Sequence, residues 1–151
     1  MPTPTQKKYI EEKFYFLLPI EKPEVPERIL EVASEEGLYE KPECHVSLVV
    51  EKSGVKIREG LAKSSDPEKF KQAILDLFNE LPFEYSLTDK YSLQEKSYTR
   101  EELDARGLQD EPPQLRRSIV QVVDMPEVEV FYKKVSQLLN IELEVPVPHT
   151  T

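Results

Sequence analysis

The segment Glu43-Cys44-His45-Val46-Ser47-Leu48-Val49-Val50 decides the interpretation of this chain. Its apolar residues predict a strand over residues 44–50. Side chains two positions apart on a strand point to the same face, so His45 and Ser47 stand side by side and Cys44 faces the other way. The segment therefore predicts an imidazole and a hydroxyl that share one face of a strand.

A second segment repeats this pairing near the other end of the chain. The sequence contains two histidines, and the second begins His149-Thr150-Thr151, after the apolar run Val145-Pro146-Val147-Pro148. The same alternation places His149 and Thr151 on one face. The chain thus offers two matching half-sites, each with a group that titrates near neutral pH and a neutral hydroxyl.

Two such half-sites contain the groups needed to hydrolyse a phosphodiester. One neutral histidine can take a proton from the attacking water, while a protonated histidine gives a proton to the leaving oxygen. The two hydroxyls can hold the non-bridging phosphate oxygens. This scheme requires no metal and no cofactor.

Two copies of His-x-Ser/Thr between hydrophobic residues resemble the motifs of the two-histidine (2H) phosphoesterase superfamily, which includes cyclic phosphodiesterases and RNA-ligase-like proteins. A hydrophobic segment and a helical pattern precede the first motif in the order typical of that superfamily, at residues 14–20 and 26–36. The resemblance implies that His45 and His149 are the catalytic acid and base, and that Ser47 and Thr151 bind phosphate. It implies an α+β fold, a two-lobed pseudo-symmetric domain of antiparallel sheets with flanking helices.

The domain boundaries follow from the two ends of the sequence. Residues 1–12 begin with a stretch rich in Pro and Thr, which we expect to be disordered or loosely held. Residues 13–151 have the length of one domain and are expected to form a single 2H phosphoesterase-like unit. Pro146 and Pro148 would each remove a ladder donor, which predicts an edge or weakly paired strand before the second motif. Superfamily members continue into further strands there, so a truncation after Thr151 is left open as an alternative.

Periodicity and turn signals predict the remaining elements. We expect a turn at 52–54, a partner strand at 55–58, a helix opened by Asp66-Pro67, strands at 83–87 and 118–123, and a helix opened by Pro126. Residues 89–114 are polar and predict a long loop with one helical turn after Thr99, either a lid or a solvated insertion. Both halves then run strand, helix, motif strand, which predicts an internal pseudo-repeat.

Composition limits the classes of function. Apolar residues make up 38% of the chain and charged residues 32%, and no run approaches the roughly 18 apolar residues of a membrane span. No apolar core follows the first lysines, so we expect no signal peptide and a cytoplasmic location. A net charge of −9 argues against a groove for long nucleic acid, because such grooves are rich in Lys and Arg. We expect a monomer whose partner is a small nucleotide or a short RNA end, with no membrane contact.

Other residues have weaker claims to a functional role. The single Cys44 excludes an intramolecular disulfide, leaves too few ligands for a usual zinc site, and is expected to be a buried structural thiol. Tyr15 and Tyr98 could stack on a base, although packing in a core or at a strand edge is commoner. Five arginines could reach a phosphate, although solvated surface charge is their commoner role: Arg58, Arg100, Arg106, Arg116 and Arg117.

Three functions are consistent with this sequence. The first is a metal-independent phosphodiesterase that hydrolyses a cyclic phosphate, in a 2′,3′-cyclic nucleotide or a short RNA end, by two-histidine acid–base catalysis. The second is a binding module of the same fold, which holds a nucleotide or a protein partner without turnover. The third is an interaction domain in which both histidines are structural.

Overall fold

The computed structural model describes residues 2–11, 14–38, 44–98, 100–105 and 114–151. Within these ranges the chain combines helices with two three-stranded antiparallel sheets, which confirms the α+β class. The first sheet has the order β1-β2-β3, with strands Lys8–Ile10, Tyr15–Ile20 and Cys44–Ser47. The second has the order β4-β5-β6, with strands Ser86–Tyr98, Gln114–Asp124 and His149–Thr150.

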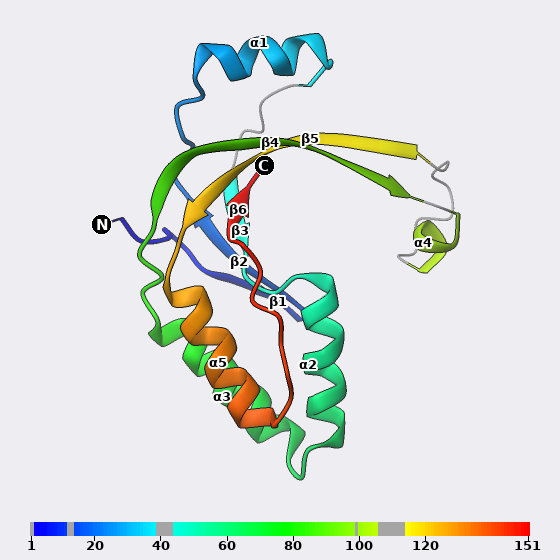
Figure 1. Cartoon of the computed structure of the whole chain (residues 1–151). Coiled ribbons are helices and arrows are strands. Elements are labelled where there is room, and N and C mark those ends of the chain that lie inside the picture. The colour runs from blue at the N-terminus through cyan, green and yellow to red at the C-terminus, as the bar shows by residue number, and fades with distance from the viewer. Residues whose placement is uncertain (1, 12–13, 39–43, 99, 106–113) are drawn as a thin grey trace.

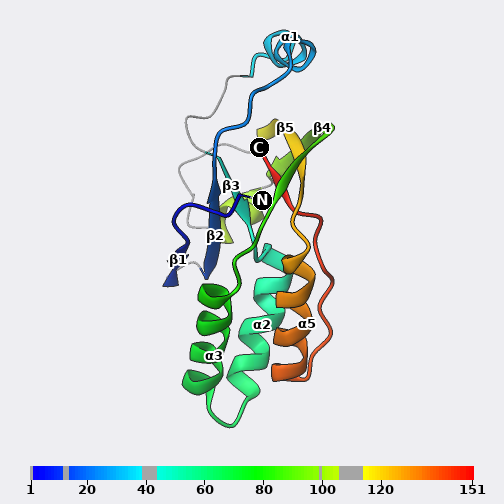
Figure 2. The ribbon, with the colours of Figure 1, turned by 90° about the vertical axis from the view of Figure 1, so that its left-hand side faces the viewer.

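The helices lie at different ends of the sheets. Three of the described helices pack side by side at one end (Figures 1 and 2): α2 (Glu51–Lys63), α3 (Pro67–Glu80) and α5 (Glu127–Leu139). α1 (Glu27–Glu35) lies at the opposite end, beyond the second sheet, and α4 (Arg100–Ala105) lies at the tip of the long β4–β5 ribbon (Figure 1). No described helix combines the length and the apolar content that a membrane crossing requires.

The main core lies between the first sheet and the three packed helices. β2 alternates in burial, and Phe16, Leu18 and Ile20 are on its buried side. The Phe16 ring packs edge-on against the Phe78 ring of α3, with 5.1 Å between centroids, and its centroid lies 6.2 Å from that of Phe131 in α5. Buried aromatic rings contribute a large share of the hydrophobic driving force. The core thus joins β2 to helices from both halves of the chain.

The N-terminal segment differs from its expected loose state. Residues Lys8–Ile10 form β1, which pairs with β2. Lys7 Nζ donates hydrogen bonds to the carbonyl oxygens of Phe78 (2.7 Å) and Asn79 (3.0 Å), near the end of α3. Carbonyls at a helix C-terminus lack partners within the helix and attract positive charge. In its described part, the segment over residues 1–12 therefore supplies a strand and a helix cap.

The predicted starts of α3 and α5 are confirmed. Asp66 Oδ1 accepts a hydrogen bond from the Lys69 backbone N–H at 3.3 Å, and Pro67 occupies the first turn. Pro126 directly precedes α5. Proline suits this position because its missing N–H would have had no partner in the first turn.

The expected turn at 52–54 and strand at 55–58 are wrong, because α2 covers both. Ser53, Ile57 and Leu61 are buried and recur every four residues, which is the spacing of one helix face. Val55, an apolar residue of the expected strand, is 49% exposed on this helix. A short run of alternating residues therefore suggested the wrong period, and the longer helical pattern determines the fold.

The long loop expected over residues 89–114 is also wrong in its first part. β4 begins at Ser86, later than the strand predicted at 83–87, and pairs with β5 as far as Tyr98. No described residue from 86 to 95 is buried, so this strand lacks the apolar alternation that would have predicted it. The helical turn predicted after residue 99 is present as α4, and residues 106–113 lie outside the described part of the chain.

Candidate functional site

The first motif lies on β3, at the edge of the first sheet. β3 is antiparallel to β2, with His45 opposite Pro19 and Ser47 opposite Leu17. His45 and Ser47 are exposed, whereas Val46 between them is buried in the core. The imidazole and the hydroxyl therefore share the outward side of the strand, as the alternation predicts.

The second motif lies on β6, at the edge of the second sheet. β6 is antiparallel to β5, with His149 opposite Val122. The assigned strand starts at His149, which confirms the predicted effect of the two preceding prolines. His149 is half-buried, Thr150 is buried, and Thr151 follows the strand and is exposed.

A backbone contact determines how the His149 ring can act. Its Nδ1 atom lies 3.0 Å from the Val147 carbonyl oxygen. A carbonyl oxygen only accepts hydrogen bonds, so Nδ1 carries a proton in this contact. Proton exchange with a substrate would therefore use Nε2 of His149.

The two motif strands each end a strand–helix–strand order along the chain. β2, α1 and β3 follow one another along the chain, and β3 pairs with β2. In the same way β5, α5 and β6 follow one another, and β6 pairs with β5. β3 and β6 also lie against each other, although neither strand pairs with the other through a sheet ladder. The fold thus brings together two motif strands that are separated by about a hundred residues of sequence.

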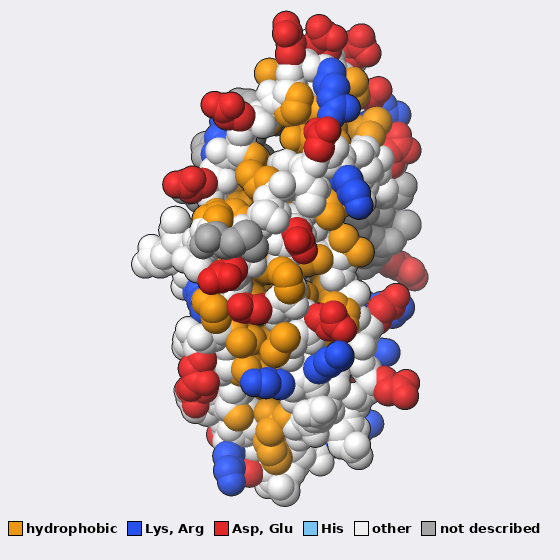
Figure 3. All heavy atoms as spheres, turned by 60° about the vertical axis from the view of Figure 1, so that its left-hand side comes forward, with side chains coloured by type: hydrophobic (Ala, Val, Ile, Leu, Met, Phe, Trp, Pro, Cys, Tyr) orange, Lys and Arg blue, Asp and Glu red, His pale blue; other side chains and the backbone are white. Residues whose placement is uncertain are grey.

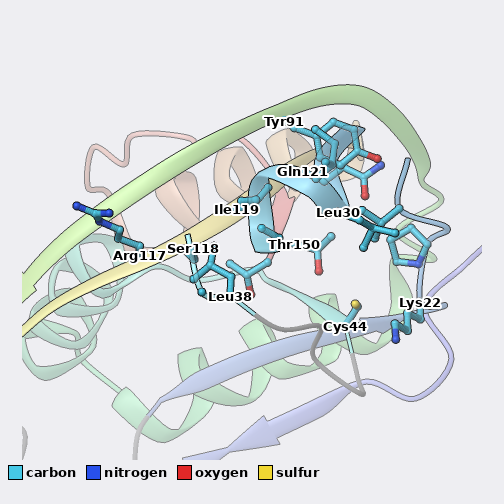
Figure 4. A pocket seen from close by; sticks show the side chains of 16 residues that line it. Lys22, Leu30, Leu38, Cys44, Tyr91, Arg117, Ser118, Ile119, Gln121 and Thr150 are labelled. Carbon is cyan, nitrogen blue, oxygen red and sulfur yellow. The ribbon is translucent and has the colours of Figure 1, made fainter. Parts of the chain in front are cut away.

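Two neighbouring cavities open beside these strands. The first, of about 400 Å³, lies between α1 and the second sheet, and Thr150, Thr151 and Cys44 contribute to its wall (Figure 4). The second, of about 480 Å³, contains His45 in its wall. Lys22 and Cys44 line both cavities. Among the described residues, His149 lines neither of these two cavities.

Thr150 presents an unusual polar group to the first cavity. The residue is 4% exposed, and its Oγ1 atom has no hydrogen-bond partner among the described residues. Gln121 lies opposite it on β5 and is also buried, but the Gln121 amide nitrogen donates to the Thr88 carbonyl oxygen at 2.8 Å. Most buried hydroxyls find a partner in proteins, so the Thr150 hydroxyl is an exception that calls for an explanation.

α1 covers the first cavity and is attached through its charged residues. Arg28 forms an ion pair with Asp89 of β4 at 2.7 Å, and its guanidinium lies 5.9 Å from the Tyr91 ring centroid. Arg117 of β5 forms an ion pair with Glu36, just after α1, at 2.6 Å. All residues of α1 are described in the structure, and none of them is fully buried. Exposed ion pairs contribute little each, so α1 is held less firmly than the core helices.

Charged side chains lie in the walls of both cavities and around them. Acidic side chains gather at the end of the molecule formed by α1 (Figure 3). Lys22 lines both cavities, Arg117 also lines the first and Lys8 the second, and the described lining of neither includes an Asp or a Glu. Burial raises the pKa of Tyr91 in the first cavity, as does Asp89, while Arg28 opposes both. The Tyr91 hydroxyl therefore stays protonated well above neutral pH and can donate a hydrogen bond.

The other arginine and tyrosine candidates are placed as follows. Arg117 also pairs with Glu95 at 2.8 Å, so carboxylates already surround its charge. The Arg58 guanidinium lies 5.1 Å from the Phe14 ring centroid, and Tyr15 is 45% exposed on β2. Arg100 pairs with Asp104 one helical turn away. The side chains of Arg116 and Tyr98, and the whole of Arg106, lie outside the described part of the structure.

Sequence reasoning missed the residues that face the first cavity. The two motifs predicted a site on the strand faces that carry the histidines. Cys44 and Thr150 lie on the opposite faces of the same strands, so they were not predicted as site residues. Tyr91 was missed because its strand was predicted as a loop, and Gln121 was missed because its own predicted strand, at 118–123, then had no partner in that region. The strand alternation that paired each histidine with a hydroxyl also places Cys44 and Thr150 on the opposite faces, and this signal could have identified them.

Comparisons with known proteins add no relative. No protein-family model, no curated protein and no solved structure matches this chain.

Proposed function

We propose that this protein is a metal-independent phosphodiesterase of the two-histidine type, which hydrolyses a cyclic phosphate in a nucleotide or at a short RNA end. The observation that carries the proposal is the equivalence of β3 and β6. Each strand is the last of a strand–helix–strand unit. β3 contains the triplet His45-Val46-Ser47, and β6 begins the triplet His149-Thr150-Thr151. The two strands lie against each other. Two half-sites on adjoining strands are what paired acid–base catalysis requires.

The roles of the four motif residues follow from their chemistry. His149 would exchange a proton through Nε2, because its Nδ1 faces the Val147 carbonyl. His45, exposed on β3, would exchange the second proton. The hydroxyls of Ser47 and Thr151 would donate hydrogen bonds to the non-bridging oxygens and stabilise the charge that develops on them.

Local charge supports a small phosphate ligand in an acidic protein. Lys8 and Lys22 line the cavity that contains His45, although the whole chain has a net charge of −9. A single phosphate can be held by such a local positive site. A long polyanion would also lie near the surrounding acidic surface. Repulsion between the two would weaken its binding, most strongly at low salt, where charges are screened least.

The direct test is turnover of 2′,3′-cyclic nucleotides, 3′,5′-cyclic nucleotides and short oligonucleotides with a terminal cyclic phosphate, all in the presence of a chelator. We expect product with at least one of these substrates, and its loss in His45→Ala and in His149→Ala. Lys56→Ala is a matched control, because Lys56 is an exposed residue of α2 away from both cavities. No product from any substrate, or equal rates in all variants, would reject the proposal.

A binding module is the second candidate, and one observation favours it. The first cavity is lined by Cys44 and Thr150, on the faces of the motif strands opposite the two histidines. Such a cavity could hold a ligand without using either imidazole. Saturable binding of a cyclic nucleotide without any product after long incubation would select this candidate over the enzyme.

A further inference from the structure

The first cavity has the volume and the lining of a small-molecule site. Its volume of about 400 Å³ lies within the range of small-molecule sites. Ile29 and Leu30 of α1 line the cavity, and Ile119 of β5 lies across from Leu30 (Figure 4). Tyr91 adds an aromatic side chain from β4. Apolar and aromatic walls of this kind favour a planar, largely apolar ligand.

A few polar groups interrupt these walls, as in a site that orients its ligand. The Thr150 hydroxyl is buried without a partner among the described residues, and Figure 4 shows its oxygen directed toward the space above Cys44. Gln121 lies opposite Thr150 on β5, and its hydrogen bond to the Thr88 carbonyl fixes its amide in the wall. A ligand with hydrogen-bonding atoms on its edge would satisfy the Thr150 hydroxyl.

The neighbouring cavity indicates what else the ligand carries. The two cavities share Lys22 and Cys44, and the second also contains Lys8 and His45. Lys8 and Lys22 place two positive charges beside His45, so an anionic group would be attracted to the second cavity. The arrangement suits an elongated molecule with a ring at one end and a phosphate at the other.

We propose that the cavity beneath α1 binds the base of a nucleotide whose phosphate lies beside His45. The inference deepens the proposed phosphodiesterase function and rests on it for the identity of the ligand. A nucleobase has the required flat ring, and its edge carries the donors and acceptors that Thr150 and Gln121 can meet. Tyr91, Thr150 and Gln121 are then base-binding residues, and Lys22 lies between base and phosphate.

The test uses nucleosides, which carry the base without any phosphate. Binding of adenosine, guanosine, cytidine and uridine to the full chain is followed by chemical-shift changes in NMR spectra at millimolar ligand. We expect saturable binding of at least one nucleoside. Thr150→Val keeps the shape of the side chain and removes the hydroxyl, so affinity should fall about tenfold. The melting temperature of this variant should stay the same or rise, because it removes a buried hydroxyl without a partner.

A second variant keeps the test independent of the fold of β6. Ala33→Phe places a ring from α1 into the cavity, and α1 has no fully buried residue whose packing this would disturb. We expect nucleoside binding to be abolished. Ala62→Phe is the matched control, because Ala62 is exposed on α2, and it should bind like the original chain.

The outcomes separate this inference from the proposed enzymatic activity. Nucleoside binding that is lost in Ala33→Phe and kept in His45→Ala, with no turnover of any substrate, would reject the enzyme and retain the base site. Turnover without saturable nucleoside binding would overturn the base site and retain the enzyme. Unchanged nucleoside affinity in Thr150→Val or in Ala33→Phe would also overturn it.

Discussion

The Tyr132 hydroxyl donates a hydrogen bond to the Leu48 carbonyl oxygen at 2.6 Å, inside the core. Tyr132 belongs to α5, the helix that precedes β6, and Leu48 directly follows β3. This bond therefore ties the helix before one motif strand to the end of the other. Both residues are fully buried, so neither group could find water as a substitute.

The variant Tyr132→Phe should lose about 1–3 kcal/mol of unfolding free energy, because the buried Leu48 carbonyl would be left without its donor. Urea denaturation followed by circular dichroism measures this loss. Tyr15→Phe is the control, since Tyr15 is 45% exposed and should change stability little. Equal midpoints for Tyr132→Phe and the original chain would show that the bond contributes nothing.

Stability should fall at alkaline pH, in part through the same residue. Burial raises the pKa of Tyr132, although hydrogen bonds with Ser53 and Val50 lower it in part. The unfolded tyrosine loses its proton near pH 10, while the folded one keeps it, so the unfolded state binds fewer protons and stability drops with rising pH. We expect the decline to begin near pH 10 and to be shallower in Tyr132→Phe. Identical slopes of unfolding free energy against pH would contradict this assignment.

The cap on α3 predicts different behaviour for two adjacent lysines. Lys7→Met should lower unfolding free energy by about 0.5–1.5 kcal/mol, because the helix-end carbonyls of Phe78 and Asn79 lose their donor. Lys8→Met removes the same charge from an exposed position on β1 and should have a smaller effect. Thermal unfolding of both variants checks the difference, and similar losses in the two would argue against the cap.

Two neighbouring rings on β2 provide a test of the core. Phe16 is 1% exposed and packs against rings from α3 and α5, so Phe16→Ala should cost about 3–5 kcal/mol. That loss approaches the whole stability of many domains of this size. Tyr15→Ala, on the opposite face of the same strand, should cost much less. Comparable denaturation midpoints for the two variants would contradict the described orientation of β2.

The proposed chemistry predicts a rate that depends on pH from both sides. If one histidine acts as base and the other as acid, the rate should rise and then fall between about pH 5 and pH 9. His45→Ala should remove this bell shape together with most of the activity. Steady-state rates in chelator across that range are the measurement, and a flat profile in the original chain would exclude paired acid–base catalysis.

Elements with a strong periodic signal could be predicted from the sequence. α3 and α5 show apolar residues at helical spacing with clear starts at Asp66-Pro67 and Pro126. β2 and β5 were found from their apolar content. The alternation around Val46 correctly placed His45 and Ser47 on one face. These features depend on local sequence, and local reasoning was sufficient for them.

The remaining features depend on contacts that are distant in sequence. β1 forms because β2 offers an edge to pair with, and Lys7 is fixed by carbonyls more than seventy residues away. β4 has no buried residue in its described first part and is held through its ladder with β5, so polarity alone predicted a loop. The first cavity requires α1, β4, β5 and β6 together. No local sequence pattern around Tyr91 or Thr150 predicts that either residue lines this cavity.

The position of β3 and β6 also affects how the molecule meets copies of itself. Each is the terminal strand of its sheet, so each has one side without a ladder partner in the described structure. Such open edges can recruit strands from other molecules and lead to aggregation. Here the two strands lie against each other. We therefore expect that a change which separates β3 from β6 would open two strand edges at once and favour self-association.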